Sequence, residues 1–196
     1  MTNKIILTDV DGVLLDWNTA FSEYMARLCV YELPDQRNRY SLCKRFGLQR
    51  EVIDKFASEY NESKNIENLK PFRDSVENIQ VLSAMGYRFI AITNVGASNQ
   101  SRVYRVTNLF NVFGDVFDDV ICLEMGASKY SVLSKWENSG LFWIEDKFTN
   151  ALDGHSLGLR SVLIDHEYNR DFSTTRFPRV SNDTPWKQIC ELIFPV

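Results

Sequence analysis

The sequence is poor in residues that characterise several common kinds of protein. Among 196 residues there are only four cysteines and two histidines, and no cysteines form a CxxC pair. A disulfide framework is therefore not expected, and we predict reduced, mostly buried thiols. The two histidines, His155 and His166, show no metal-ligand spacing and are predicted to be structural or surface residues. No repeat, low-complexity tract or glycine–serine linker divides the chain.

Long apolar runs and an excess of positive charge are also missing. The first apolar run, residues 5–7, is too short for a signal-peptide core or a membrane span. We therefore predict a soluble, cytoplasmic protein with no membrane contact. The formal net charge of -4 gives no electrostatic reason to expect binding to a nucleic-acid backbone. Small anionic substrates stay possible because they need only a local positive site, and the oligomeric state is left open.

Short apolar runs alternate with helical patterns along most of the chain. Each run is continuous and ends in polar residues, as is typical of a strand buried on both faces of a parallel sheet. The alternation predicts an α/β fold, a doubly wound three-layer parallel sheet. The predicted strands are residues 5–7, 89–92, 120–123, 141–144 and 161–164, and the predicted helices cover 76–85, 103–110, 129–138 and 185–193.

Residues 16–70 break this alternation. They contain no clear strand, and apolar residues fall on two helical faces. We therefore predict a small all-helical cap at 16–70, inserted into a core domain made of 1–15 and 71–196. Because ligands bind beyond the carboxyl ends of strands in open α/β sheets, an insert that leaves from there should lie over the site as a lid. One face holds Trp17, Phe21, Met25 and Leu28, and the other Val52, Phe56 and Tyr60.

Polar residues gather where the predicted strands end. Carboxylates that meet at one sheet edge repel each other unless a cation joins them, and oxygen ligands suit a hard ion such as Mg²⁺. Lys129 and the hydroxyl of Thr93 add a cation and a hydrogen-bond donor, which suit a phosphate group. The predicted metal ligands are Asp9, Asp11, Glu145 and Asp146.

The order and spacing of these residues resemble the four motifs of the haloacid-dehalogenase-like hydrolase superfamily, in its phosphatase branch. Residues 7–13 read LTDVDGV, which matches an apolar strand ending in DxDG. The second motif corresponds to Thr93, the third to Lys129, and the fourth to the pair Glu145 and Asp146, with Asn150 four residues beyond. Four motifs in order, each at a strand end, form a specific signal, whereas DxDG alone would be weak.

The resemblance implies a mechanism. Asp9 would attack phosphorus to form an aspartyl-phosphate, and Asp11 would protonate the leaving oxygen and then activate water. Mg²⁺ would bind Asp9, the backbone carbonyl of Asp11, and Asp146, with Glu145 directly or through water. The phosphoryl group would be held by Thr93, Asn94 and Lys129, next to the turn at Gly12.

Asp11 also separates the reactions of the superfamily. Its dehalogenases lack an acid two residues after the nucleophile, so phosphate ester hydrolysis is favoured over carbon–halogen cleavage. Phosphonate cleavage would need a lysine of the cap that forms a Schiff base. Lys55 and Lys64 lie in the insert, but a solvated lysine is the commoner case.

The cap is rich in aromatic residues, of which Trp17 and Phe21 follow the first motif most closely. A ring there could stack on a nucleobase. A helical cap at this position also resembles the 5'-deoxyribonucleotidases of the superfamily, so a (deoxy)nucleoside monophosphate is the leading substrate. Sugar phosphates are the nearest alternative. A non-catalytic protein that binds phosphate or a partner stays open, while the lack of basic excess argues against a nucleic-acid end.

Overall fold

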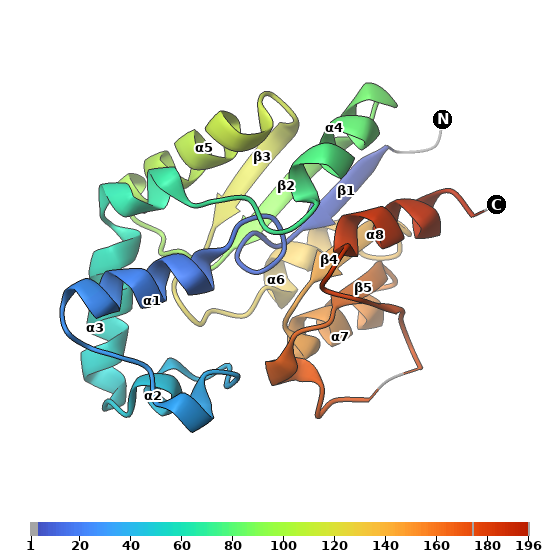
Figure 1. Cartoon of the computed structure of the whole chain (residues 1–196). Coiled ribbons are helices and arrows are strands. Elements are labelled where there is room, and N and C mark those ends of the chain that lie inside the picture. The colour runs from blue at the N-terminus through green and yellow to red at the C-terminus, as the bar shows by residue number, and fades with distance from the viewer. Residues whose placement is uncertain (1–3, 174, 196) are drawn as a thin grey trace.

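A computed structural model describes residues 4–173 and 175–195. Its centre is a six-stranded parallel sheet in the order β3-β2-β1-β4-β5-β6, so the predicted α/β fold is confirmed (Figure 1). The first strand lies between β2 and β4, at the point where the strand order reverses, and such a point is where α/β sheets bind ligands. The strands are β1 Ile5–Thr8, β2 Arg88–Thr93, β3 Phe117–Cys122, β4 Phe142–Glu145, β5 Arg160–Ile164 and β6 Arg179–Val180.

Helices cover both faces of the sheet. Alternate residues of a strand point to opposite faces. Accordingly, Ile6 of β1 packs in one apolar cluster with α4, α5 and α8, whereas Leu7 packs in another with α6 and the end of α7. This is the predicted three-layer arrangement. The core helices are α4 Ser75–Ala84, α5 Asn99–Phe113, α6 Tyr130–Leu133, α7 Phe148–Ser156 and α8 Pro185–Ile193.

The predicted strands and helices form, but some details of the prediction are wrong. β6 was missed because two residues carry no periodicity. The helix after Ser128 is much shorter than 129–138, and Asn138 has a positive φ of 56° that cannot continue a helix. In α5 the apolar face that was expected to pack inward is exposed, and it consists of Val103, Val106 and Phe110.

Within residues 16–70 the regular elements are all helical. They are α1 Trp17–Arg27, α2 Leu42–Phe46, α3 Arg50–Asn61 and the 3-10 helices Pro34–Gln36 and Lys64–Asn68. The buried faces of these helices differ slightly from the prediction. Leu28 and Val52, which were expected to face inward, are exposed, and Ile53 is buried. None of the helices in the described ranges is both long and apolar enough to cross a membrane.

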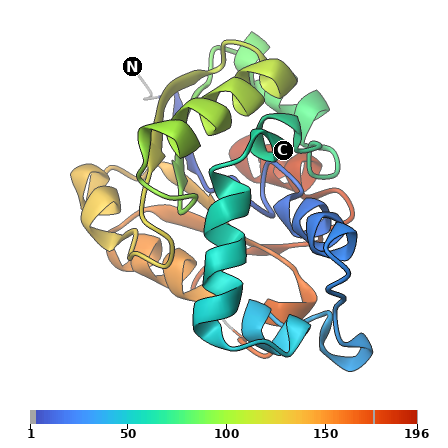
Figure 2. The ribbon, with the colours of Figure 1, turned by 90° about the vertical axis from the view of Figure 1, so that its left-hand side faces the viewer.

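The chain enters and leaves this insert at adjacent points. Leu15 and Pro71 form an isolated antiparallel bridge, and the N–H of Asp16 donates to the carbonyl of Lys70 at 2.9 Å. Figures 1 and 2 show the insert beyond the carboxyl end of the sheet, with α3 standing beside α1. The insert is also tied to α5, because the Asn108 amide donates to the carbonyls of Glu67 and Leu69, each at 3.1 Å.

Gly154 lets α7 lie unusually close to the sheet. A Cβ atom at this position would stand 2.4 Å from Cδ1 of Trp143 and 2.9 Å from Oγ of Ser161. Replacing Gly154 by Ala should therefore destabilise the protein by about 1–3 kcal/mol through overpacking, even though alanine favours a helix. Urea denaturation measures the change. Thr149→Ala on the exposed side of α7 is the control, expected within about 0.5 kcal/mol. A Gly154→Ala protein that is as stable as the wild type would contradict the close packing.

Candidate active site

The loop after β1 brings the first motif against the fourth. The N–H of Asp9 donates to the carbonyl of Ile144 at 2.9 Å, and the N–H groups of Leu14 and Leu15 turn back to the carbonyl of Val10. Gly12 has φ of 80°, and a Cβ atom there would lie 2.6 Å from Oδ2 of Asp146. Only glycine suits both this conformation and this close approach. The predicted turn at Gly12 thus sets the distance between the two acidic motifs.

Lys129 joins the first motif to the fourth. Its Nζ lies 2.7 Å from Oδ1 of Asp9 and 2.9 Å from Oε1 of Glu145, and its side chain is almost completely buried. Burial lowers the pKa of Lys129, but the two carboxylates more than reverse this, so the net shift is upward. The lysine therefore stays charged beside Asp9.

Both carboxylate oxygens of Glu145 accept hydrogen bonds from groups of the protein. Its Oε1 accepts from Lys129 and, at 2.6 Å, from the amide of Asn150, while its Oε2 accepts from the N–H groups of Asp146 and Lys147. Burial alone would raise the pKa of Glu145, but Lys129 and these donors hold it below its ordinary value. Glu145 thus fixes Lys129 and the start of α7, and Asn150, an uncertain residue of the sequence pattern, has a defined role here.

Three carboxylates form a buried acidic cluster. Ligand oxygens of Asp9, Glu145 and Asp146 all lie within 4.8 Å of one another. Burial raises the pKa of Asp9 to about 7, and burial together with the neighbouring acids raises the pKa of Asp146 well above its ordinary value. These oxygens suit a hard divalent cation such as Mg²⁺, which would favour the charged carboxylates against the burial and mutual repulsion that raise their pKa values.

The raised pKa values predict how stability depends on pH. The folded protein binds protons at Asp9, Asp11 and Asp146 more tightly than the unfolded chain does, so their contribution to stability is present at low pH and lost as pH rises from 3.8 toward about 7. The pKa values of Glu145 and His166 are lowered, so their contributions to stability increase with pH instead. These increases occur only below pH 4.5 for Glu145 and below pH 6.5 for His166, which are the ordinary pKa values of the two groups. With EDTA present, the melting temperature should fall from about pH 5 to about pH 7.

A divalent cation should reverse this trend. Because its carboxylate ligands must be deprotonated, added Mg²⁺ should raise the melting temperature more at about pH 7 than at about pH 5. A melting temperature that climbs steadily with pH in EDTA would contradict the buried acidic cluster.

Asp11 lies apart from this cluster and faces an arginine. Nη2 of Arg105 is 2.8 Å from Oδ1 and 2.9 Å from Oδ2 of Asp11. Burial raises the pKa of Asp11, and Arg105 opposes the shift. A metal contact through the backbone carbonyl of Asp11 stays a prediction.

The second motif ends β2 at Thr93 and Asn94. The Thr93 hydroxyl is completely buried, and Thr93 is not among the residues that line the cavity between the sheet and the insert, so its contact with a phosphate stays a prediction. Asn94 instead donates to the carbonyls of Glu124 and Ala127 at 2.8 and 3.0 Å. Asn94 therefore holds the loop that precedes Lys129 and lines the site at the same time.

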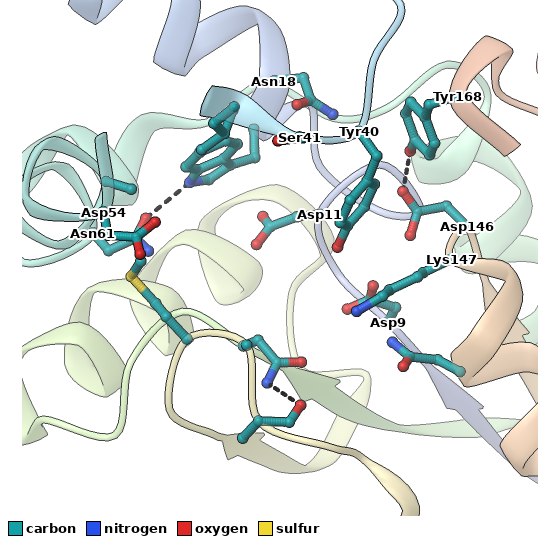
Figure 3. A pocket seen from close by; sticks show the side chains of 18 of the residues that line it. Asp9, Asp11, Asn18, Tyr40, Ser41, Asp54, Asn61, Asp146, Lys147 and Tyr168 are labelled. Atoms are coloured by element: carbon teal, nitrogen blue, oxygen red, sulfur yellow. Dashed lines mark hydrogen bonds between the residues drawn. The ribbon is translucent and has the colours of Figure 1, made fainter. Parts of the chain in front are cut away.

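A cavity of about 410 Å³ lies between these residues and the insert (Figure 3). Its core side includes Asp9, Asp11, Lys129 and Asp146. Its insert side includes Trp17, Asn18, Tyr40, Ser41 and Asn61.

The two aromatic residues that were expected to contact substrate differ in position. Trp17 lines the cavity, and its indole N–H donates to Oδ1 of Asn61 at 2.8 Å. Phe21 is completely buried behind Trp17 and stacks on it, with ring centroids 4.6 Å apart. The structure therefore does not place Phe21 at the cavity, because Phe21 lies one helical turn further on the same face and packs behind Trp17 in the core of the insert.

Several cavity residues were missed by the sequence interpretation. Tyr168 donates a hydrogen bond to Asp146, and its ring meets that of Tyr40 edge-on at 5.4 Å. Nζ of Lys147 lies 5.4 Å from the Tyr40 ring, and Figure 3 shows the Tyr40 hydroxyl directed toward the acids. Burial and these acids raise the pKa of Tyr40, so it stays a hydrogen-bond donor. The position of Lys147 after the acidic pair was a usable signal, whereas nothing marked the two tyrosines or Arg105.

The arrangement of the sheet and its helices is that of the haloacid-dehalogenase-like fold. Solved structures share it, including a haloacid dehalogenase-like hydrolase from Streptococcus pneumoniae (TM-score 0.67, 17% identity, 97% of this chain and 99% of that chain). A predicted phosphatase from Clostridium acetobutylicum (0.66, 15%, 97% and 100%) and CbbY from Rhodobacter sphaeroides in complex with phosphate (0.60, 16%, 90% and 92%) are also similar. At these identities the likeness establishes the fold.

No protein-family model matches the chain. By sequence it is similar to an uncharacterized 32.4 kDa protein of the Gp30-rIII intergenic region of Enterobacteria phage T4. The two are 30% identical in an alignment of 138 residues, and the alignment covers 66% of this chain. The matched part is 48% of the phage protein, so the similarity spans about half of that relative's length.

Proposed function

We propose that this chain is a magnesium-dependent phosphomonoester hydrolase in which Asp9 is the nucleophile. One observation carries the proposal. Asp9 lies at the floor of the cavity with its carboxylate against the buried ammonium of Lys129 and within reach of Asp146. Such a set of groups can take up a phosphate dianion when a divalent cation joins Lys129 in offsetting the negative charge of the carboxylates.

Each residue of the site has a separate role in the proposed reaction. Lys129 and the hydroxyl of Thr93 would hold phosphoryl oxygens, while Asp9 attacks phosphorus in line. Asp9 and Asp146 would hold Mg²⁺, with the Asp11 carbonyl, and Glu145 would act mainly through Lys129 and the backbone. Bound Mg²⁺ would neutralise the repulsion between carboxylate and phosphate. Asp11, which lines the cavity, would give a proton to the leaving oxygen and later take one from water.

Proteins that share the fold include several described as phosphatases, CbbY in complex with phosphate, and an L-2-haloacid dehalogenase. The choice of a phosphatase among these activities therefore rests on the residues of this chain. Asp11 is present and turned into the cavity, which favours protonation of an ester oxygen over carbon–halogen cleavage.

For the substrate we propose a (deoxy)nucleoside monophosphate. Trp17 offers a ring at the cavity, and Asn18, Ser41 and Asn61 offer hydrogen bonds to a polar leaving group. The same amides and hydroxyls suit a sugar phosphate, which is the second candidate. A protein that only binds phosphate or a partner is disfavoured, because binding alone would not need both Asp9 and Asp11.

Hydrolysis of an aryl phosphate with Mg²⁺ or with EDTA tests this proposal. We expect turnover that depends on Mg²⁺ and is lost with EDTA, because Asp9 and Asp146 repel the phosphate when no cation lies between them. Restoration by excess Mg²⁺ is the control for damage by the chelator. Equal activity in EDTA would contradict the proposed chemistry. A panel of nucleoside monophosphates and sugar phosphates then tests the substrate, and a flat profile would contradict the nucleotide proposal.

A further inference from the structure

Arg105 is buried in an unusual setting. It is completely buried on the inward face of α5, beside Leu109 and Phe113 of the same helix. A buried guanidinium is unfavourable unless it is paired. Its burial among apolar side chains therefore indicates that Arg105 has a specific partner.

That partner is Asp11. One guanidinium nitrogen, Nη2, contacts both carboxylate oxygens at 2.8 and 2.9 Å. The other two nitrogens, Nε and Nη1, have no hydrogen-bond partner in the part of the chain that the structure describes. Asp11 lines the cavity and Arg105 does not. Any influence of Arg105 on a substrate must therefore pass through Asp11.

The helix that carries Arg105 is itself fixed. Asn108 lies three residues on, on the same face, and donates to the carbonyls of Glu67 and Leu69 at the end of the insert. Arg105 consequently approaches Asp11 from a rigid support. Without it, Asp11 would lose its counter-charge beside the acidic cluster of Asp9 and Asp146, and repulsion would favour other orientations.

We propose that Arg105 is a positioning residue that holds the Asp11 carboxyl group where it exchanges protons with the substrate. This inference rests on the proposed function. In the first step an Asp9 oxygen bonds to phosphorus, the ester P–O bond breaks, and the proton of Asp11 goes to the leaving oxygen. In the second step a water oxygen bonds to phosphorus, the Asp9–phosphorus bond breaks, and a proton of that water returns to Asp11.

The test exploits the dependence on the leaving group. An alkyl phosphate needs the proton of Asp11, whereas p-nitrophenol leaves readily as an anion. Arg105→Met should therefore lower kcat about 100-fold for an alkyl phosphate but less than about tenfold for p-nitrophenyl phosphate, with little change in KM. Arg105→Lys keeps the charge and should recover part of the alkyl phosphate rate. Arg102→Met, an exposed arginine of the same helix, is the matched control.

Each outcome decides between the two proposals. Equal losses for both substrates would overturn the positioning role, because a purely structural defect does not discriminate between leaving groups. A wild-type protein that hydrolyses neither substrate with Mg²⁺ would overturn the proposed function and this role with it. If Arg105→Met does not fold, the same comparison is made with Arg105→Lys. A crystal structure of the variant gives a measurement that does not depend on catalytic activity. The Asp11 side chain should move from its wild-type position, and an unmoved Asp11 would overturn the proposal.

Discussion

Asp9→Asn is expected to reduce phosphatase turnover by at least about 1,000-fold, because a carboxamide does not form the acyl phosphate that a carboxylate forms. The variant keeps the size and shape of the side chain, so the cavity should still form. It also removes a buried acid whose pKa is raised to about 7 by burial. The metal-free protein should therefore lose little stability, which separates the loss of chemistry from a loss of fold.

Rapid mixing with substrate and acid quenching adds a second readout for Asp9. The wild type should carry covalent phosphate on Asp9, and the variant should carry none. Asp171→Asn, at an exposed position away from the cavity, is the control and should keep its activity within about twofold. Turnover by Asp9→Asn that stays near the wild-type rate would contradict the assignment of the nucleophile.

The residues at the strand ends were predictable because neighbouring strands of a parallel sheet place their carboxyl ends side by side. Asp9, Thr93 and Glu145 lie at the ends of β1, β2 and β4, which are neighbours in the sheet. Once apolar runs are recognised as buried strands, their carboxyl ends must share one edge. The number of residues between the motifs does not affect this inference. The predicted meeting of Lys129 with these acids followed from the same topology.

Residues whose roles depend on tertiary contact were not predictable. α5 shows why, since the structure buries Leu109 and Phe113 together with Arg105 and Asn108 instead of the face that was expected to point inward. Periodicity assigns apolar residues to the core, so it gives no signal for polar residues that a helix buries beside a site. Tyr40 reaches the cavity from a loop and Tyr168 from the short 3-10 helix Glu167–Asn169, and neither segment has a periodic signal. The same limit explains why Phe21 was expected at the cavity although it packs inside the insert.

Lys129→Met is expected to affect stability as strongly as activity. The substitution leaves Asp9 and Glu145 buried without their shared counter-charge, and breaking such a pair costs about 3–5 kcal/mol. It also removes the ammonium that would face the phosphate, with an expected loss of about 100- to 1,000-fold in kcat. Urea denaturation in EDTA measures the first effect, and hydrolysis of an aryl phosphate with Mg²⁺ measures the second.

A double variant separates the two effects. In Lys129→Met with Glu145→Gln, one unpaired carboxylate becomes neutral, while the side-chain oxygen can still accept from the N–H groups of Asp146 and Lys147. The double variant should therefore regain much of the lost stability but none of the lost activity, because the phosphate would still lack its cation. If activity returned together with stability, Lys129 would be a structural counter-ion alone. If stability did not return, the ion pair with Glu145 would not explain why this lysine is buried.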